Sequence, residues 1–180
     1  SEIERLEDRI RRLIRDSREL VKTLKKELKE IIERLEELSE RLRREIERVV
    51  REVEDVVRKR RSDKIEDLVR RLKERLDRII EESRDLNEKT KRELERVIRE
   101  IERSSKESED RAKKIEDLIR AGSDIDELLK KLDEIATRDR EKIERLREEI
   151  RKIARKDEED IRKLVKEIRD EVRKLKEDAR

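Results

Sequence analysis

The stretch LKKELKEIIERLEELSERLRREIERVVREVEDV, residues 24–56, decides the fold of this chain. Its aliphatic side chains recur at intervals of three or four residues, which is the spacing of one face of an α-helix. The positions on this face are Leu24, Leu28, Ile31, Leu35, Leu38, Leu42, Ile46, Val49, Val53 and Val56. The spacing therefore predicts a long amphipathic helix with a continuous apolar stripe.

The stripe repeats every 18 residues in each third of the chain. Equivalent positions include Leu6, Leu24 and Leu42; Leu76, Leu94 and Ala112; and Ile125, Ile143 and Ile161. Eighteen residues make five turns at 3.6 residues per turn, whereas heptad and eleven-residue repeats impose supercoils of opposite hand. We therefore expect three equivalent helices that hardly supercoil.

The stripe loses its phase at two places, and signals for helix ends and starts coincide only there. The basic run at residues 58–61 suits a helix C-terminus, and Asp63 then begins an Asp-x-x-Glu capping box. Gly122 suits the end of the second helix, and Asp124 begins another Asp-x-x-Glu pattern. The expected helices span about residues 2–61, 64–121 and 124–179, with loops near Ser62–Asp63 and Gly122–Ser123.

Connections this short make sequential helices antiparallel neighbours. The sequence thus predicts an all-α fold, an elongated, nearly untwisted up-down-up bundle of three helices in a single domain, residues 1–180. Each helix of nearly 60 residues would be roughly 90 Å long at about 1.5 Å per residue. A free-standing charged helix is the competing interpretation, but such a helix needs no apolar stripe, and every segment here has one.

The composition lacks the residues that most biochemical activities require. Charged residues make up 62% of the chain, and 57 Lys and Arg interleave with 54 Asp and Glu, so no unopposed basic face is expected to bind nucleic acid. The chain has no His or Cys, the residues that nucleophilic catalysis and zinc binding most often use, and its one glycine cannot form a phosphate loop. We expect no enzyme activity and no cofactor.

No apolar run approaches the roughly 20 residues of a membrane span, and no signal-peptide pattern opens the chain. We therefore expect a soluble protein with no membrane partner, and its localisation stays open.

These features together resemble a de novo, parametrically designed straight helical bundle. The resemblance covers all 180 residues and rests on the 18-residue block, on repetitive surface segments such as residues 144–150, and on purely aliphatic packing with minimal turns. Spectrin-like three-helix repeats resemble the chain less, because they carry core aromatics. The resemblance implies a thermostable, monomeric scaffold that requires no partner. A helical module that self-associates or binds a designed partner helix is the alternative.

Polar residues interrupt the apolar stripe at positions that fall at two common levels. In an antiparallel hairpin, residues at one level have numbers that sum to twice the loop centre, about 125 and about 247 here. Ser17 with Ser108, Ser108 with Asp139, and Thr90 with Asp157 meet this condition. One predicted layer holds Ser17, Ser104, Ser105, Ser108 and Asp139. The other holds Asn87, Thr90 and Asp157, with Ser39 and Ser83 just beyond.

The chemistry of these residues favours a structural role. A carboxylate has about four acceptor sites and no donor, whereas each hydroxyl supplies one donor, so clustering satisfies both. We expect hydrogen-bonded layers that penalise slipped registers. Alternatively, Asp139 and Asp157 lie at the edge of the stripe and reach water. A metal site has little support, because calcium prefers several carboxylates and each layer has one.

Overall fold

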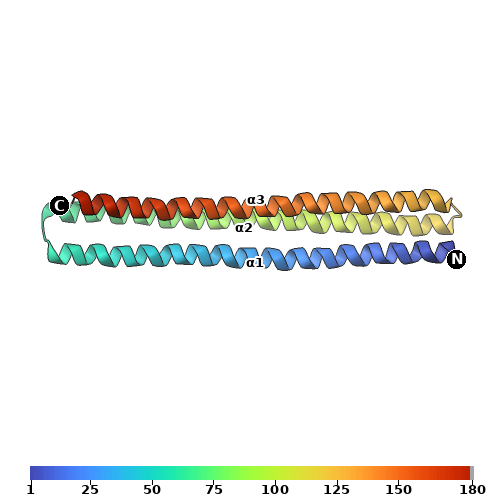
Figure 1. Ribbon diagram of the computed structural model, residues 1–180, viewed down its shortest axis with the longest axis horizontal. Helices are drawn as coiled ribbons and strands as arrows, with labels where there is room; N and C mark the ends of the chain where they lie inside the picture. Colours follow the sequence, from blue (N-terminus) through green and yellow to red (C-terminus); the bar gives the residue numbers. More distant parts are fainter. Residues whose placement is uncertain (179–180) are drawn as a thin grey trace. The chain divides into compact units, whose positions relative to one another are not determined.

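The chain folds as an all-α three-helix bundle in the computed structural model, which describes residues 1–178 (Figure 1). Its helices are α1 (Glu2–Lys59), α2 (Asp63–Arg120) and α3 (Ile125–Asp178). No strand occurs in this described range. The helix bounds lie within two residues of the expected ones, and residue 179, the expected last residue of the third helix, lies outside the described residues.

Contacts divide the chain into two compact units, and each helix contributes a segment to both. Unit 1 consists of Ser1–Glu30 and Glu93–Lys152, and unit 2 consists of Ile31–Arg92 and the described part of Ile153–Arg180. Within each unit the α2 segment runs antiparallel to the α1 and α3 segments (Figure 1). The expectations of a single domain and of an untwisted bundle concern both units together and stay predictions.

The apolar stripe is the buried face of these helices. Of the ten stripe positions in residues 24–56, seven are buried, and Ile31, Leu38 and Val56 are half-buried. Full burial of one such side chain contributes about 1.5–3 kcal/mol, which is several times the helix propensity of one residue. Packing of the stripe therefore dominates the stability of the helices.

One core cluster of unit 1 contains only aliphatic residues from all three helices. Its buried members are Leu6, Ile10, Ala112, Ile115, Ile119, Leu128 and Leu132. Leu6, Ile10 and Ala112 have no exposed surface. The small side chain of Ala112, on α2, occupies a position where the 18-residue block elsewhere places leucine. The cluster thus combines large and small side chains.

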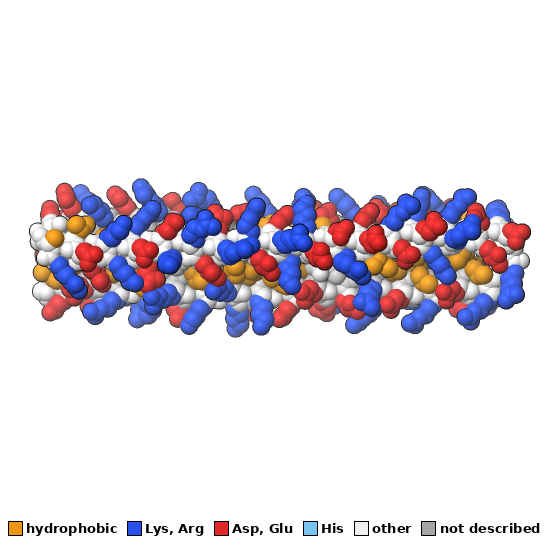
Figure 2. Space-filling model, turned by 180° about the vertical axis from the view of Figure 1, so that it is seen from behind, with side chains coloured by type: hydrophobic (Ala, Val, Ile, Leu, Met, Phe, Trp, Pro, Cys, Tyr) orange, Lys and Arg blue, Asp and Glu red, His pale blue; other side chains and the backbone are white. Residues whose placement is uncertain are grey.

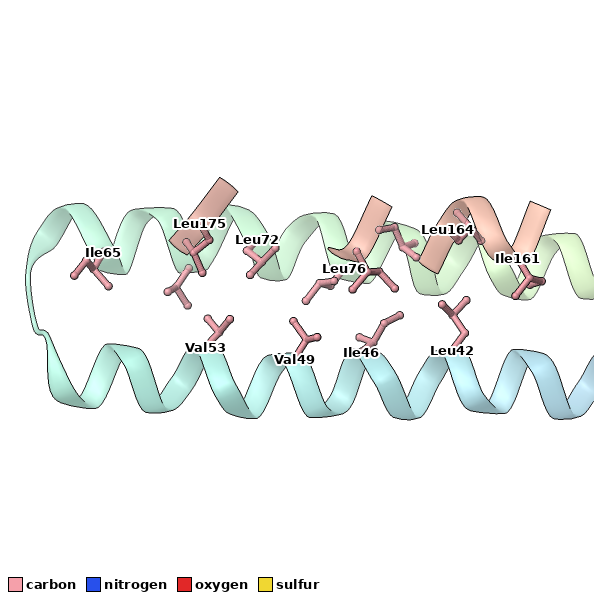
Figure 3. Close-up of a cluster of buried hydrophobic side chains, with 13 residues drawn as sticks. Leu42, Ile46, Val49, Val53, Ile65, Leu72, Leu76, Ile161, Leu164 and Leu175 are labelled. Atoms are coloured by element: carbon pink, nitrogen blue, oxygen red, sulfur yellow. The ribbon is translucent and has the colours of Figure 1, made fainter. Parts of the chain in front are cut away.

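The corresponding cluster of unit 2 is larger. Its buried members are Leu42, Ile46, Val49, Val53, Ile65, Val69, Leu72, Leu76, Ile79, Ile161, Leu164, Ile168 and Leu175. Figure 3 shows Ile46 and Val49 of α1 directed toward Leu76 of α2. Leu164 and Leu175 of α3 complete the core, so side chains from all three helices exclude water from its centre.

The start of α2 differs from the expected capping box, because Ser62 and not Asp63 is the N-cap. The backbone N–H of Ile65 donates to Ser62 Oγ at 3.2 Å, and that of Glu66 donates to the Ser62 carbonyl at 3.0 Å. Asp63 is instead the first helical residue, where its negative charge favours the positive end of the helix dipole. Ser62 therefore satisfies one of the first free N–H groups of α2.

The second turn has the geometry of a Schellman motif. Gly122 has a φ of 83°, a left-handed conformation that side chains with a Cβ rarely adopt. The N–H of Gly122 donates to the Ile119 carbonyl and that of Ser123 to the Leu118 carbonyl, both at 3.1 Å. Asp124 then caps α3 through a 3.2 Å hydrogen bond that its Oδ1 accepts from the backbone N–H of Asp126.

The caps of α2 can be tested by two alanine substitutions. Ser62→Ala removes the hydroxyl that accepts from the backbone and should lower the free energy of unfolding by about 1 kcal/mol. Asp63→Ala removes only a charge near the helix N-terminus and should lower it by less, about 0.3–0.5 kcal/mol. Urea titrations measure both losses. A larger loss of unfolding free energy for Asp63→Ala than for Ser62→Ala would mean that Asp63 is the N-cap of α2, as the sequence pattern indicated.

Candidate functional site

Four of the predicted polar residues are joined by hydrogen bonds inside unit 1, and we call Ser17, Ser105, Ser108 and Asp139 the Asp139 cluster. Ser108 Oγ donates to Asp139 Oδ1 at 2.8 Å, and Ser17 Oγ donates to Asp139 Oδ2 at a longer 3.4 Å. Ser17 Oγ also lies 2.7 Å from Ser105 Oγ. Either hydroxyl can donate in this pair; when Ser17 donates to the carboxylate, Ser105 donates to Ser17.

The Asp139 cluster joins all three helices of unit 1. Ser17 lies on α1, Ser105 and Ser108 lie one turn apart on α2, and Asp139 lies on α3. The three serines are buried, whereas Asp139 is half-buried. Each serine proton therefore has an acceptor, and the carboxylate keeps access to water for its remaining acceptor sites.

Ser104, the fifth member of the predicted layer, is buried but forms no hydrogen bond within residues 1–178. It lines a pocket of about 340 Å³ between α2 and α3 together with Ser108 and Asp139. Adjacent residues on a helix point about 100° apart, so Ser104 and Ser105 face different neighbours. Ser105 reaches Ser17, and Ser104 does not.

Thr90 and Asp157 form a separate pair in unit 2. Thr90 Oγ1 donates to Asp157 Oδ1 at 2.6 Å, and the Asp157 side chain is 2% exposed in relative terms. Asp157 Oδ2 is buried without a hydrogen-bond partner. Burial raises the pKa of Asp157, the Thr90 hydrogen bond opposes this shift, and the nearby carboxylates of Asp160 and Glu158 add to it.

Ser39, Ser83 and Asn87 stand apart from this pair. In the described chain no hydrogen bond connects any of them to Thr90 or Asp157. All three instead line a pocket of about 330 Å³ between α1 and α2. The structure thus brings together Thr90 and Asp157 and places the other three residues of the predicted layer around a separate cavity.

Ion pairs between helices were not foreseen from the sequence. Lys25 Nζ lies 2.8 Å from Glu102 Oε1 in unit 1, and Lys73 Nζ lies 3.3 Å from Glu54 Oε1 in unit 2. In unit 1 the hydrogen bond from Arg18 also holds the pKa of Glu109 below its usual value. Residues at one level of the first hairpin have numbers that sum to about 125, and the residue numbers of each ion pair sum to nearly this value. The same condition could therefore have predicted these pairs from the sequence. Such exposed pairs contribute at most about 1 kcal/mol each.

The described residues contain no group of three or more acidic side chains arranged to hold a metal ion. Over the same range, none of the helices carries a stretch that is long and apolar enough to cross a bilayer. Comparisons with protein-family models, curated proteins and solved structures give no match.

The Asp139 cluster predicts that a single substitution is more harmful than a complete replacement. Asp139→Ala leaves the Ser17 and Ser108 hydroxyls without their acceptor and should lower the free energy of unfolding by about 1–3 kcal/mol. Replacing Ser17, Ser108 and Asp139 by leucine and Ser105 by valine reproduces the residues at equivalent positions and should be neutral or stabilising.

Urea midpoints measure these effects, provided that the slopes of the transitions match. Asp133→Ala, which removes an exposed carboxylate from the same helix, is the control and should have an effect of at most about 1 kcal/mol. If Asp139→Ala unfolds at the same urea concentration as the parent, the Asp139 cluster contributes nothing to stability.

Asp157 predicts a pH dependence of stability that differs from that of a salt-bridged aspartate. Its pKa is raised above the ordinary value of 3.8, so its contribution is full below that value and declines as pH rises through the raised pKa. Compared with Asp157→Asn, the parent should therefore lose stability as the pH rises above the ordinary pKa of 3.8. Urea titrations of both proteins on either side of this pKa measure the difference. A constant difference would mean that the carboxyl titrates as it does in the unfolded chain.

Proposed function

We propose that this chain is a designed, self-contained structural scaffold that acts as a monomer and needs no cofactor, substrate or partner. The observation that carries the proposal is the burial of the apolar stripes against one another within each unit. Among large hydrophobic residues in the described chain, only Ile3 and Leu118 are exposed, at 45% and 38%. Little apolar surface is left to drive association.

The surface supports the absence of a charged partner. Figure 2 shows Lys and Arg side chains interleaved with Asp and Glu over the visible face, and hydrophobic side chains emerge only in small patches between them. The net charge of the chain is +3. Nucleic-acid binding depends on clustered, unopposed positive charge, and membrane binding depends on a broad apolar face.

The Asp139 cluster gives the scaffold a means to specify one register. A slip of α3 by one turn moves Asp139 by about 5.4 Å, which is beyond hydrogen-bond reach of Ser17 and Ser108. In the direction that brings Asp139 level with Ala112, the carboxylate would lose both donors without gaining another. Such a register is disfavoured by the desolvation of an unpaired charge, whereas an all-aliphatic stripe would tolerate it.

A design origin rests on the regularity of the chain. The 18-residue block, the aliphatic cores and the short capped turns agree with one another at every level, as idealised designs do. No catalytic role is proposed, because the buried serines have no histidine to act as base.

Solution mass and thermal stability test this proposal. Light scattering coupled to size-exclusion chromatography should give a mass near 22.2 kDa at all concentrations. Unfolding followed by circular dichroism should require more than about 90 °C, as is common for idealised helical designs. A mass of twice the formula value would favour the alternative, a module that self-associates, and melting near about 60 °C would contradict an idealised design.

A further inference from the structure

The connection between α1 and α2 in unit 2 is exposed and strongly basic. Residues 58–64 have the sequence RKRRSDK, which contains five cationic side chains and one carboxylate. All seven residues are exposed. The five cationic side chains form no ion pair with any of the described residues, whereas the nearby Arg70 and Arg71 are both paired with Asp67. The positive charge of this segment is therefore available to a group outside the chain.

Ser62 is the nucleophilic side chain of this segment. Figure 1 shows the connection as a thin loop between the α1 and α2 ribbons, and Arg61 and Ser62 belong to neither helix. Among the exposed hydroxyl residues of the described chain, Ser1, Ser62 and Ser123 lie outside the helices, whereas Thr23 and Thr137 lie within them. An enzyme reaches a hydroxyl in an exposed loop more easily, because a hydroxyl within a helix becomes accessible only after local unfolding.

The charge pattern distinguishes Ser62 from the serine of the other turn. Four cationic residues, 58–61, directly precede Ser62, and Lys64 follows it by two residues. Ser123 follows Ala121 and Gly122, and Arg120 is the only cation among the four residues before it. Protein kinases choose their substrates in part by the charge around the acceptor residue. A kinase with carboxylates along its substrate groove is therefore complementary to the segment around Ser62, since these carboxylates pair with its basic side chains.

We propose that Ser62 is a phosphorylation site for serine/threonine protein kinases that recognise basic residues before the acceptor serine. Ser62 Oγ attacks the γ-phosphorus of MgATP bound to the kinase, and the bond from this phosphorus to the oxygen that bridges it to the β-phosphate breaks. ADP leaves, and the hydroxyl proton passes to the catalytic aspartate of the kinase. Before the attack, Ser62 releases the 3.2 Å hydrogen bond that it accepts from Ile65, and the terminal turn of a helix opens at low cost. This site does not depend on the scaffold role.

The phosphate would remain at the N-terminus of α2, where the fold favours it. It carries a charge of about −1.5 to −2 at pH 7 and three acceptor oxygens. The first backbone N–H groups of α2 and the positive end of the helix dipole favour such a group, as do the neighbouring basic side chains. The carboxylate of Asp63 opposes this effect, but five cations outnumber it. Phosphorylation should therefore stabilise the start of α2.

Incubation of the full chain with MgATP and the catalytic subunit of cyclic-AMP-dependent protein kinase tests the site. Mass spectrometry should show the addition of one phosphoryl group, and fragmentation should locate it on Ser62. The phosphorylated protein should unfold at a urea concentration about 0.2–0.5 M higher than the unmodified protein. No incorporation, faster incorporation at Ser123 or at a hydroxyl within a helix, or a lower urea midpoint would overturn the proposal.

Variants test which residues the kinase recognises. Ser62→Ala should incorporate no phosphate. Lys59→Gln combined with Arg60→Gln should lower the initial rate at least about tenfold, because two charges that pair with the kinase are lost. Arg70→Gln combined with Arg71→Gln removes the same charge from exposed positions within α2, so this matched control should keep the parent rate. A parent-like rate for the first pair of substitutions would refute recognition of the basic run.

Discussion

Burial of aliphatic side chains along one face of each helix is the constraint on which the rest of this structure depends. A residue of high helix propensity gains only a fraction of a kcal/mol, whereas a buried leucine contributes about 1.5–3 kcal/mol. In each unit the α1, α2 and α3 segments supply side chains to the same core, so none can bury its face without the others. The capped turns at Ser62 and Gly122 then fix where each stripe begins and ends.

The polar residues on the buried face differ in how completely the protein satisfies them. The Asp139 cluster supplies every serine proton with an acceptor and leaves Asp139 half-buried beside water. Asp157 receives one hydrogen bond from Thr90, and its second oxygen has none, so burial raises its pKa. Ser39 Oγ is buried without a partner, and within residues 1–178 Ser83 forms no hydrogen bond. The first arrangement favours a single register, whereas the last leaves a buried hydroxyl without a hydrogen bond.

The sequence predicts levels and faces well because both follow from helix geometry. The 18-residue period identified the buried positions, and the level rule paired Thr90 with Asp157 and Ser108 with Asp139. It could not tell which of two adjacent serines reaches across, because Ser104 and Ser105 lie at nearly the same level and both are buried. It also placed the cap of α2 at Asp63, since the Asp-x-x-Glu spacing is as regular as the serine one residue before it.

Native-state amide hydrogen exchange tests most directly whether mutual burial holds these helices in place. Within each unit, the slowest amides of the α1, α2 and α3 segments should share one free energy of opening and one dependence on urea, because the three segments lose their core together. Helices held by their own charged surfaces would open separately. Three different opening free energies within a unit, each insensitive to urea, would contradict the account.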